Sequence, residues 1–107
     1  MKTNELNFQG LVCVQASDSE ITGGYTSDLL SDVMAHLKEG DALITIQAHK
    51  NTVAVASLTG ASAVIFCHGR TVSMDVLEVA AKENIALFVS AVSQFETTLA
   101  LAKALGR

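Results

Sequence analysis

The chain has 107 residues, a length that fits one domain with one hydrophobic core. Its formal net charge is −4, and Lys and Arg together number only seven, so it lacks the basic surface that neutralises the phosphates of a nucleic acid. The N-terminal residues lack the apolar core of a signal peptide, and no apolar run approaches the roughly 18 residues of a membrane span. We therefore expect one cytoplasmic domain, residues 1–107, that binds neither nucleic acid nor membrane.

Hydrophobic residues make up 50% of the chain and charged residues 17%, which is more apolar surface than a small monomer easily hides. We expect a sheet that is covered on both faces and, in addition, a partner subunit. The two cysteines, Cys13 and Cys67, sit within apolar runs without metal-type spacing, and we interpret both as buried reduced thiols.

Two extended segments are predicted near the N-terminus. Residues 11–14 predict a first strand after a poorly ordered terminus. A polar turn follows, and residues 20–25 then predict a short extended segment that Gly23 and Gly24 interrupt. Because glycine tolerates a bulge or a positive φ, we expect the chain to bend at this pair before it enters a helix.

The clearest helix follows at residues 29–37, where apolar side chains recur at helical spacing. Ser27 or Asp28 is the predicted N-cap, and Gly40 stands where a helix C-terminus requires a C′ residue. Residues 42–46 are too few for a helix and almost all apolar, so they predict a central strand that is buried on both faces.

The second half of the chain continues this alternation with short loops. The predicted elements are a helix at 52–58, a strand at 63–67, a helix at 74–83, a strand at 85–89 and a helix from Ser93 towards Leu105. Asn51, Ser73 or Thr71, and Ser93 are the predicted N-caps of the three helices. Alternating elements with short loops are typical of right-handed βα units, so the prediction is an α/β fold with a mostly parallel sheet of about five strands. The N-terminal strand is free to join it antiparallel.

The last helix differs from the others because it is apolar on two stripes, one with Phe95 and Leu99 and the other with Leu101 and Leu105. Such a helix must be covered on more than one side. It is therefore either deeply packed or in contact with another chain.

Polar loops leave the predicted strands and lead into helix N-termini. In open α/β sheets, ligands bind at the carboxyl ends of the strands, where free helix amides attract anions. We expect a small polar or anionic ligand there, and the candidate ligand-binding residues are Thr22, Gly23, Gly24, Asp28, Gln47, His49, Asn51, His68 and Arg70. A purely structural role is the alternative for each: turn geometry for the glycines, helix capping for Asp28 and Asn51, and solvated surface positions for the histidines.

No complete catalytic motif is present: the chain has no phosphate-binding P-loop, no G-x-G-x-x-G and no G-x-S-x-G elbow. Asp28, His49, Cys67 and His68 could hold a metal only if their loops converged, and the adjacent Cys67 and His68 cannot both ligate without a sharp turn. We therefore name no catalytic residue and expect neither a metal nor another cofactor.

Four ordered blocks carry a family resemblance. They are Thr22-Gly23-Gly24-Tyr25, the helix segment 27–34, Ile44-Thr45-Ile46-Gln47, and the segment 49–56. Together they resemble the DRTGG domain, over about residues 18–105. The family's opening Asp-Arg is matched only by Asp18-Ser19, so a role of that arginine in anion binding does not carry over.

The resemblance implies a non-catalytic regulatory module that forms a homodimer. DRTGG domains occur in the regulatory regions of pyrophosphatases, and their fold resembles the N-terminal domains of HPr kinase/phosphorylase and of Mur ligases. Our first hypothesis is that this module senses a nucleotide or another small anion at the carboxyl ends of the strands, or that it interacts with a partner enzyme. Two alternatives stay open: an accessory protein for a redox enzyme such as an iron hydrogenase, and a small enzyme that uses His49 or His68 as its base.

Overall fold

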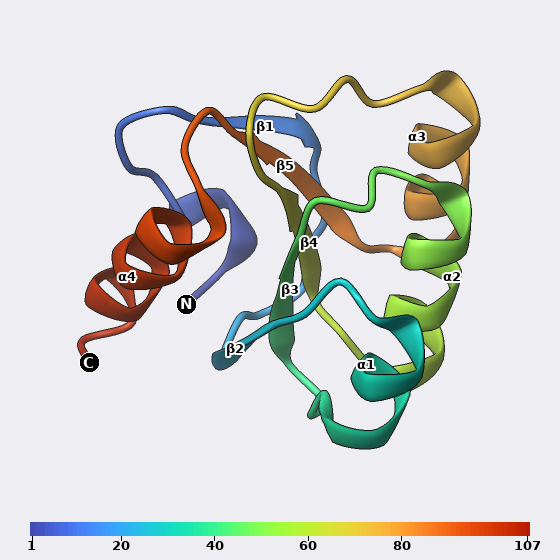
Figure 1. Ribbon diagram of the computed structural model, residues 1–107, viewed down its shortest axis with the longest axis horizontal. Helices are drawn as coiled ribbons and strands as arrows, with labels where there is room; N and C mark the ends of the chain where they lie inside the picture. Colours follow the sequence, from blue (N-terminus) through green and yellow to red (C-terminus); the bar gives the residue numbers. More distant parts are fainter.

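Five strands form one sheet in the order β1-β5-β4-β3-β2 in the computed structural model, which describes residues 1–107 (Figure 1). The strands are β1 Leu11–Gln15, β2 Gly23–Thr26, β3 Asp41–Thr45, β4 Ala63–Phe66 and β5 Ala86–Ser90. Strands β2 to β5 are parallel, and β1 pairs with β5 antiparallel. The predicted α/β fold with a mostly parallel five-stranded sheet is therefore confirmed.

Helices cover both faces of this sheet. The helices α1 Leu30–His36, α2 Lys50–Thr59 and α3 Met74–Glu83 lie on one face, and α4 Gln94–Ala104 lies on the other together with the short 3-10 helix η1 Thr3–Glu5 (Figure 1). Successive residues of a strand point to opposite faces, so Leu43 packs under α1 to α3 whereas Ile44 packs under α4. Both layers have a continuous apolar core, which is why the central strands contain almost no polar residue.

The N-terminus departs from the prediction. Residues 3–5 form η1, the Thr3 side chain is buried, and Lys2 forms an antiparallel bridge with Glu20. The Thr3 hydroxyl donates to the Ser17 carbonyl at 2.7 Å. The expected poorly ordered terminus is wrong, because these contacts fix it across the chain that connects β1 to β2.

The helix ends follow the prediction in part. Ser93 caps α4 by accepting a hydrogen bond from the Glu96 amide, and Gly60 ends α2 with a φ of 88°. Asn51 is not a cap, since it lies inside α2 and His49 takes the capping position, with its Nδ1 accepting from the Asn51 amide at 3.1 Å. Ser73 stands at the N-cap of α3, but its hydroxyl bonds the Asp75 carboxylate instead of a helix amide.

The predicted cap of α1 is also wrong. Its N-cap is Leu29 and no side chain bonds the helix amides there. The Ser27 hydroxyl accepts from the Leu29 amide, one residue too early to cap the helix, and Asp28 points to β3 instead. Gly40 has a φ of 89° but follows the helix end by four residues, because α1 stops at His36.

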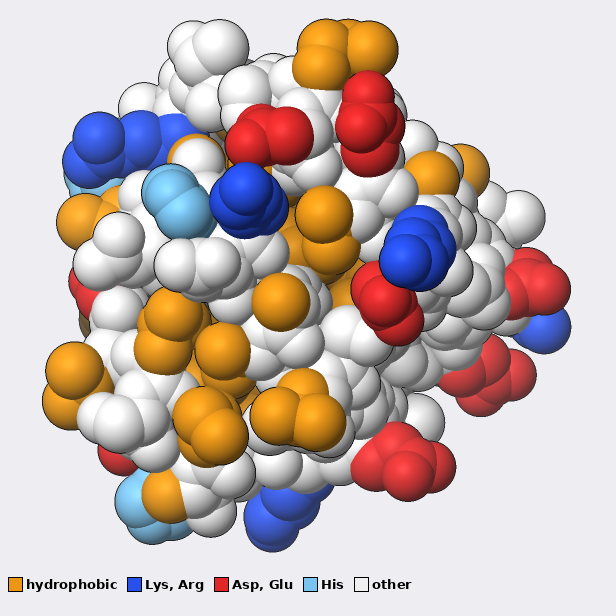
Figure 2. Space-filling view, turned by 90° about the vertical axis from the view of Figure 1, so that its right-hand side faces the viewer, with side chains coloured by type: hydrophobic (Ala, Val, Ile, Leu, Met, Phe, Trp, Pro, Cys, Tyr) orange, Lys and Arg blue, Asp and Glu red, His pale blue; other side chains and the backbone are white.

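Apolar side chains remain exposed on several elements. Figure 2 shows hydrophobic side chains gathered on the face that α1, α2 and α3 present to solvent. Large exposed hydrophobic residues on or next to these helices are Leu29, Met34, Leu58 and Met74. Phe95 and Leu99 are exposed on α4 whereas Leu101 is buried, so the sheet covers only one of the two apolar stripes of that helix. No helix in the structure is both long and apolar enough to cross a bilayer.

Candidate functional site at the open edge of strand β2

The predicted site residues do not share one edge of the sheet. Gln47 and His49 follow the end of β3 and His68 follows the end of β4, so they lie at the carboxyl ends of the strands. Gly23 instead begins β2 and pairs with Asp41, the first residue of β3. The expectation of a single site is therefore wrong for Thr22, Gly23 and Gly24, which lie at the opposite, amino-terminal edge.

At the carboxyl ends of the strands, Asp28 forms the best-defined cluster. Its Oδ1 accepts three hydrogen bonds, from the Thr45 hydroxyl at 2.8 Å, the Ile46 amide at 2.9 Å and the Gln94 side-chain amide at 3.1 Å. Gln47 also donates to the Asp28 carbonyl at 3.4 Å. Asp28 thus ties the entrance of α1 to β3 and α4, which gives it a structural role that a helix cap would not.

The remaining predicted residues at this end are exposed and do not enclose a cavity. None of the three cavities in the structure is lined by His49, Asn51, His68 or Arg70. His68 has a φ of 60°, and its amide donates to the Val92 carbonyl, which fixes the turn after β4. The topology brings these residues to one edge, but it provides no pocket between them.

The two cysteines differ in environment. Cys67 is buried, and this burial raises the pKa of its thiol, while a contact with the Thr97 hydroxyl at 3.5 Å partly opposes the shift. Cys13 is exposed on β1, so its predicted burial is wrong. Its strand lies at the edge of the sheet, where no helix fully covers it. No group of three His, Cys, Asp or Glu side chains lies close enough to hold a metal ion.

The glycine pair is part of a regular strand and not of a bulge. Neither Gly23 nor Gly24 has a positive φ, so the predicted bend is wrong. Both glycines pack closely against side chains: a Cβ on Gly23 would lie 2.6 Å from Oδ1 of Asp41 and one on Gly24 would lie 2.8 Å from Cδ2 of Leu101, so a larger residue would force these side chains to move. The pair therefore lets β2 approach both neighbours closely.

A cavity of about 490 Å³ opens beside this strand. We call it the β2 groove, and it is lined by Thr22, Gly23, Gly24, Tyr25, His36, Lys38, Glu39, Asp41 and Arg107. Its volume falls within the range of small-molecule sites, roughly 300–1,000 Å³. Three of the nine predicted ligand-binding residues line it.

Two aromatic rings form one wall of the groove. The Tyr25 and His36 rings stack with centroids 6.3 Å apart and an interplanar angle of 18°. Both are held by Asp32: the Tyr25 hydroxyl donates to Oδ2 at 2.6 Å, and Nδ1 of His36 lies 3.1 Å from Oδ1. The bond from Tyr25, followed by those from Ser27 and His36, lowers the pKa of Asp32. The carboxylate therefore stays ionised and orients both rings.

Two cations complete the groove. The Arg107 guanidinium donates one hydrogen bond to the Thr22 carbonyl at 3.0 Å and keeps its other N–H groups free. Neither Lys38 nor Arg107 lies within ion-pair distance of a carboxylate, since the one contact of this kind joins Asp32 to His36, which is charged only when protonated. The carboxylates of Glu39 and Asp41 also line the groove, and that of Asp41 accepts the Lys38 amide at 2.9 Å and is largely buried.

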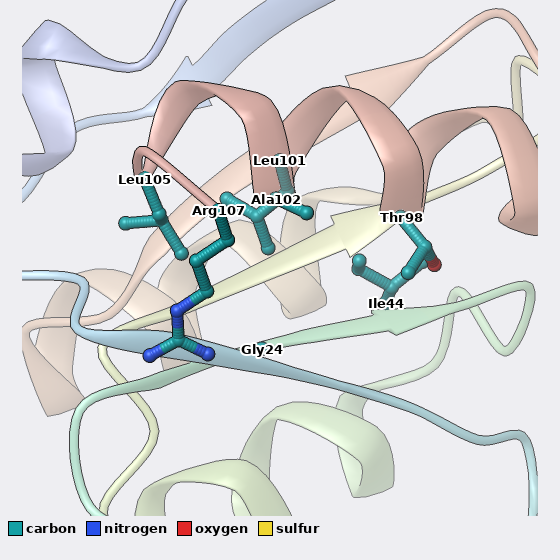
Figure 3. Close-up of a pocket in the computed structure, with 7 residues that line it drawn as sticks. All are labelled: Gly24, Ile44, Thr98, Leu101, Ala102, Leu105 and Arg107. Atoms are coloured by element: carbon teal, nitrogen blue, oxygen red, sulfur yellow. The ribbon is translucent and has the colours of Figure 1, made fainter.

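A smaller apolar cavity of about 180 Å³ lies between β2 and α4 and shares Gly24 and Arg107 with the β2 groove. Figure 3 shows the Arg107 side chain descending from the end of α4 to β2, beside Leu105 and Ala102. Cavities therefore flank β2 on the side of α1 and on the side of α4, and the same arginine reaches both.

Tyr25 is the only tyrosine of a chain without tryptophan, so its ionisation can be followed directly. The hydrogen bond to Asp32, then desolvation and then the Asp32 charge, raise the pKa of Tyr25 above its ordinary value. We expect the ultraviolet absorbance titration of the protein to show this raised pKa and Asp32→Asn to return it towards the ordinary value. Asp75→Asn, on α3, is the control and should leave the titration unchanged. A normal pKa in the parent protein would contradict the contact.

Sequence reasoning missed six residues of the groove: Tyr25, His36, Lys38, Glu39, Asp41 and Arg107. The spacing of His36 four residues after Asp32 was a visible signal, since such pairs meet on one helix face. The approach of Arg107 to Thr22, 85 positions away, left no trace in the local sequence.

Comparison with known proteins agrees with this architecture. A solved structure of the CBS and DRTGG domains of the regulatory region of Clostridium perfringens pyrophosphatase, complexed with the activator diadenosine tetraphosphate, superposes with a TM-score of 0.66 over 77% of this chain. The predicted resemblance to a DRTGG domain is confirmed at the level of the fold. The DRTGG-like chain is 20% identical to that structure and spans 36% of its length. No family model matches the chain, and no curated protein matches it.

Proposed function

We propose that this chain is a non-catalytic regulatory module of the DRTGG family that binds a nucleotide or a similar small anion in the β2 groove. The observation that carries the proposal is one cavity that brings together Lys38, Arg107 and a stacked aromatic pair; Glu39 and Asp41 line it as well, but neither forms an ion pair with the two cations. Cations suit phosphate groups and an aromatic surface suits a planar base. That the similar pyrophosphatase region was solved with a dinucleotide activator supports the ligand class.

The proposal includes two copies of the module acting together on an enzyme. The exposed apolar residues on α1, α2, α4 and β1 support self-association where they gather into patches, because contiguous exposed apolar patches mark interaction surfaces. The enzyme that is regulated is either a separate partner or another part of a longer chain. The exposed histidines of the carboxyl end line no cavity, which gives the alternative of a small enzyme no structural support.

The test is ligand binding by the parent protein and matched variants. Adenosine mono-, di- and triphosphate, diadenosine tetraphosphate and inorganic phosphate are titrated, and the melting temperature and the fluorescence of Tyr25 are recorded. A ligand that binds only the native state raises the melting temperature. At a ligand concentration 100-fold above Kd, it adds about 2.7 kcal/mol to the free energy of unfolding. We expect at least one nucleotide to stabilise the protein and to change the Tyr25 signal.

Lys38→Ala and Arg107→Ala should each weaken that binding about tenfold, since a charged hydrogen bond contributes roughly 1.5 kcal/mol or more. Lys82→Ala removes an equally exposed cation on α3 and should leave Kd unchanged. A protein that no nucleotide stabilises, or a Lys38→Ala protein that binds as the parent does, would refute the site.

A further inference from the structure

Strand β1 is an edge strand with exposed side chains on both of its faces. Val12 is 59% exposed, Val14 is 37% exposed, and Cys13 between them is exposed as well. A strand at the edge of a sheet also presents unpaired backbone groups. β1 therefore combines an open hydrogen-bonding edge with an apolar surface.

The two edges of the sheet are protected to different degrees. β2 carries two glycines and lies beside the charged side chains of the β2 groove, including Arg107, which bonds the backbone just before it. β1, with the sequence LVCVQ, has no charge and no proline. Charges and prolines are the usual devices that prevent edge strands from pairing. β1 has neither, although it is short and its register with β5 shifts between Cys13 and Gln15, so residues 11–13 are the regular part of an edge that is able to pair.

The hydrogen-bond pattern shows which backbone groups of β1 are free. The Ala91 amide donates to the Gly10 carbonyl, and the antiparallel register continues through Val12 opposite Val89. Backbone groups alternate in direction along an antiparallel strand, so those of Val12 point to β5 and those of Cys13 point to the open edge. Cys13 is thus the residue around which a further strand would pair.

We propose that two copies of this chain pair antiparallel through β1, about a two-fold axis at Cys13, to form a continuous ten-stranded sheet. The inference rests on the dimeric half of the proposed function and names its interface. In this register Cys13 lies opposite Cys13 of the partner subunit in a hydrogen-bonded pair, with Cα atoms about 5.5 Å apart. Val12 lies opposite Val14 of the partner subunit, the residue that the register shift leaves without a partner in β5.

We assign a second copy of the chain to the open edge of β1 because the strand is complementary to itself in this register. The two-fold axis generates two valine-to-valine pairs, which are favourable cross-strand contacts, and it brings no like charges together. A shallow hollow of about 600 Å³ lies next to the start of β1 and is lined by Phe8, Gln9, Gly10, Ala91, Val92, Glu96 and Ala100. We expect contacts beyond the strands to contribute, because a pair of short strands alone buries less than the roughly 800 Å² per partner of a standard interface.

The experiment measures the oligomeric state of the full chain by sedimentation and native mass spectrometry over a range of concentrations. We expect a dimer for the parent protein, and we expect Val12→Lys to raise its dissociation constant at least about tenfold, because the pairing would bury two unpaired charges. Leu58→Lys on α2 is the matched control, since it places the same charge on an exposed apolar residue away from β1. It should leave the dimer intact.

Cross-linking of the parent chain tests the register without a destabilising substitution. A Cα separation of about 5.5 Å is suitable for a disulfide, so mild oxidation or a short thiol cross-linker should join two subunits through Cys13. Cys67 is buried and serves as an internal control. Cys13→Ser should abolish the covalent dimer and leave the non-covalent dimer unchanged.

Three results would overturn the interface: a monomer at all concentrations, a dimer that Leu58→Lys dissociates but Val12→Lys does not, or a dimer that Cys13 fails to cross-link. Nucleotide binding is measured on the same variants, so that the two proposals fail separately. A Val12→Lys monomer that still binds a nucleotide would support both the interface and the β2 groove. Binding by no variant, with dimers that respond as expected, would refute only the groove.

Discussion

Leu101→Ala is expected to lower the free energy of unfolding by about 3 kcal/mol, within the range of buried leucine truncations. Leu101 is only 2% exposed and is the residue of α4 that enters the core shared with Ile44 and Phe88. Because α4 covers most of one face of the sheet, truncation of the Leu101 side chain leaves a cavity in that core. Chemical denaturation followed by circular dichroism measures the change directly.

The control is on the same helix. Leu99→Ala removes the same atoms from a side chain that is 43% exposed, and it should cost well under half as much, about 1 kcal/mol or less. Equal losses at the two positions would mean that α4 is not oriented as described. The comparison also tests the outward-facing stripe, since a Leu99→Ala cost that grows with protein concentration would place Leu99 in an interface between copies.

Asp28→Ala is expected to destabilise the protein by about 3 kcal/mol, which corresponds to a fall in melting temperature on the order of 12 °C. The substitution leaves the Thr45 hydroxyl and the Ile46 amide without their acceptor at a site that is closed to solvent around Thr45. An unsatisfied buried donor costs about 1–3 kcal/mol. Thermal and chemical unfolding give the two values.

Asp28→Asn separates the hydrogen bonds from the charge. All three donors bond Oδ1, so an asparagine oxygen in the same place can accept them, and we expect it to lose less than half as much stability as the alanine variant. If Asp28→Ala were as stable as the parent protein but failed to bind a ligand, Asp28 would be a binding residue, as the sequence suggested, and not a structural one.

The two proposed surfaces lie at opposite edges of the sheet, because β1 and β2 are its terminal strands. A ligand in the β2 groove and a partner subunit on β1 therefore do not compete for the same atoms. The sheet between them is the rigid element that connects the ligand site to the dimer interface. We expect substitutions in the β2 groove to change ligand binding and substitutions in β1 to change dimerisation.

Much of the fold could be predicted from local patterns. The final helix was located by Ser93 at its start, and the central strands were located by their short apolar runs. The N-cap prediction for α2 was wrong because two neighbouring polar residues, His49 and Asn51, were both suitable. Local spacing does not decide which of the two side chains faces the free helix amide. The first strand was located, but the exposure of Cys13 depends on its place at the edge of the sheet.

The candidate site was less predictable than the fold. The glycine pair drew attention to the segment that lines the β2 groove, but the predicted bend was wrong, since the pair packs closely against Asp41 and Leu101 within a regular strand. Asp28 was noticed as a polar loop residue, yet its hydrogen-bond donors come from β3 and from α4, 66 positions away. No local pattern contains contacts of that separation.

The sequence by itself determined the alternation of strands and helices, because hydrophobic periodicity and turn residues act over a few positions and express the local geometry of each element. Only the tertiary structure decided that Gly23 begins a strand, that Arg107 meets Thr22 and that β1 and β2 are the edges. The physical reason is that strand order and side-chain convergence depend on which apolar faces pack together, a property of the whole chain and not of any single segment.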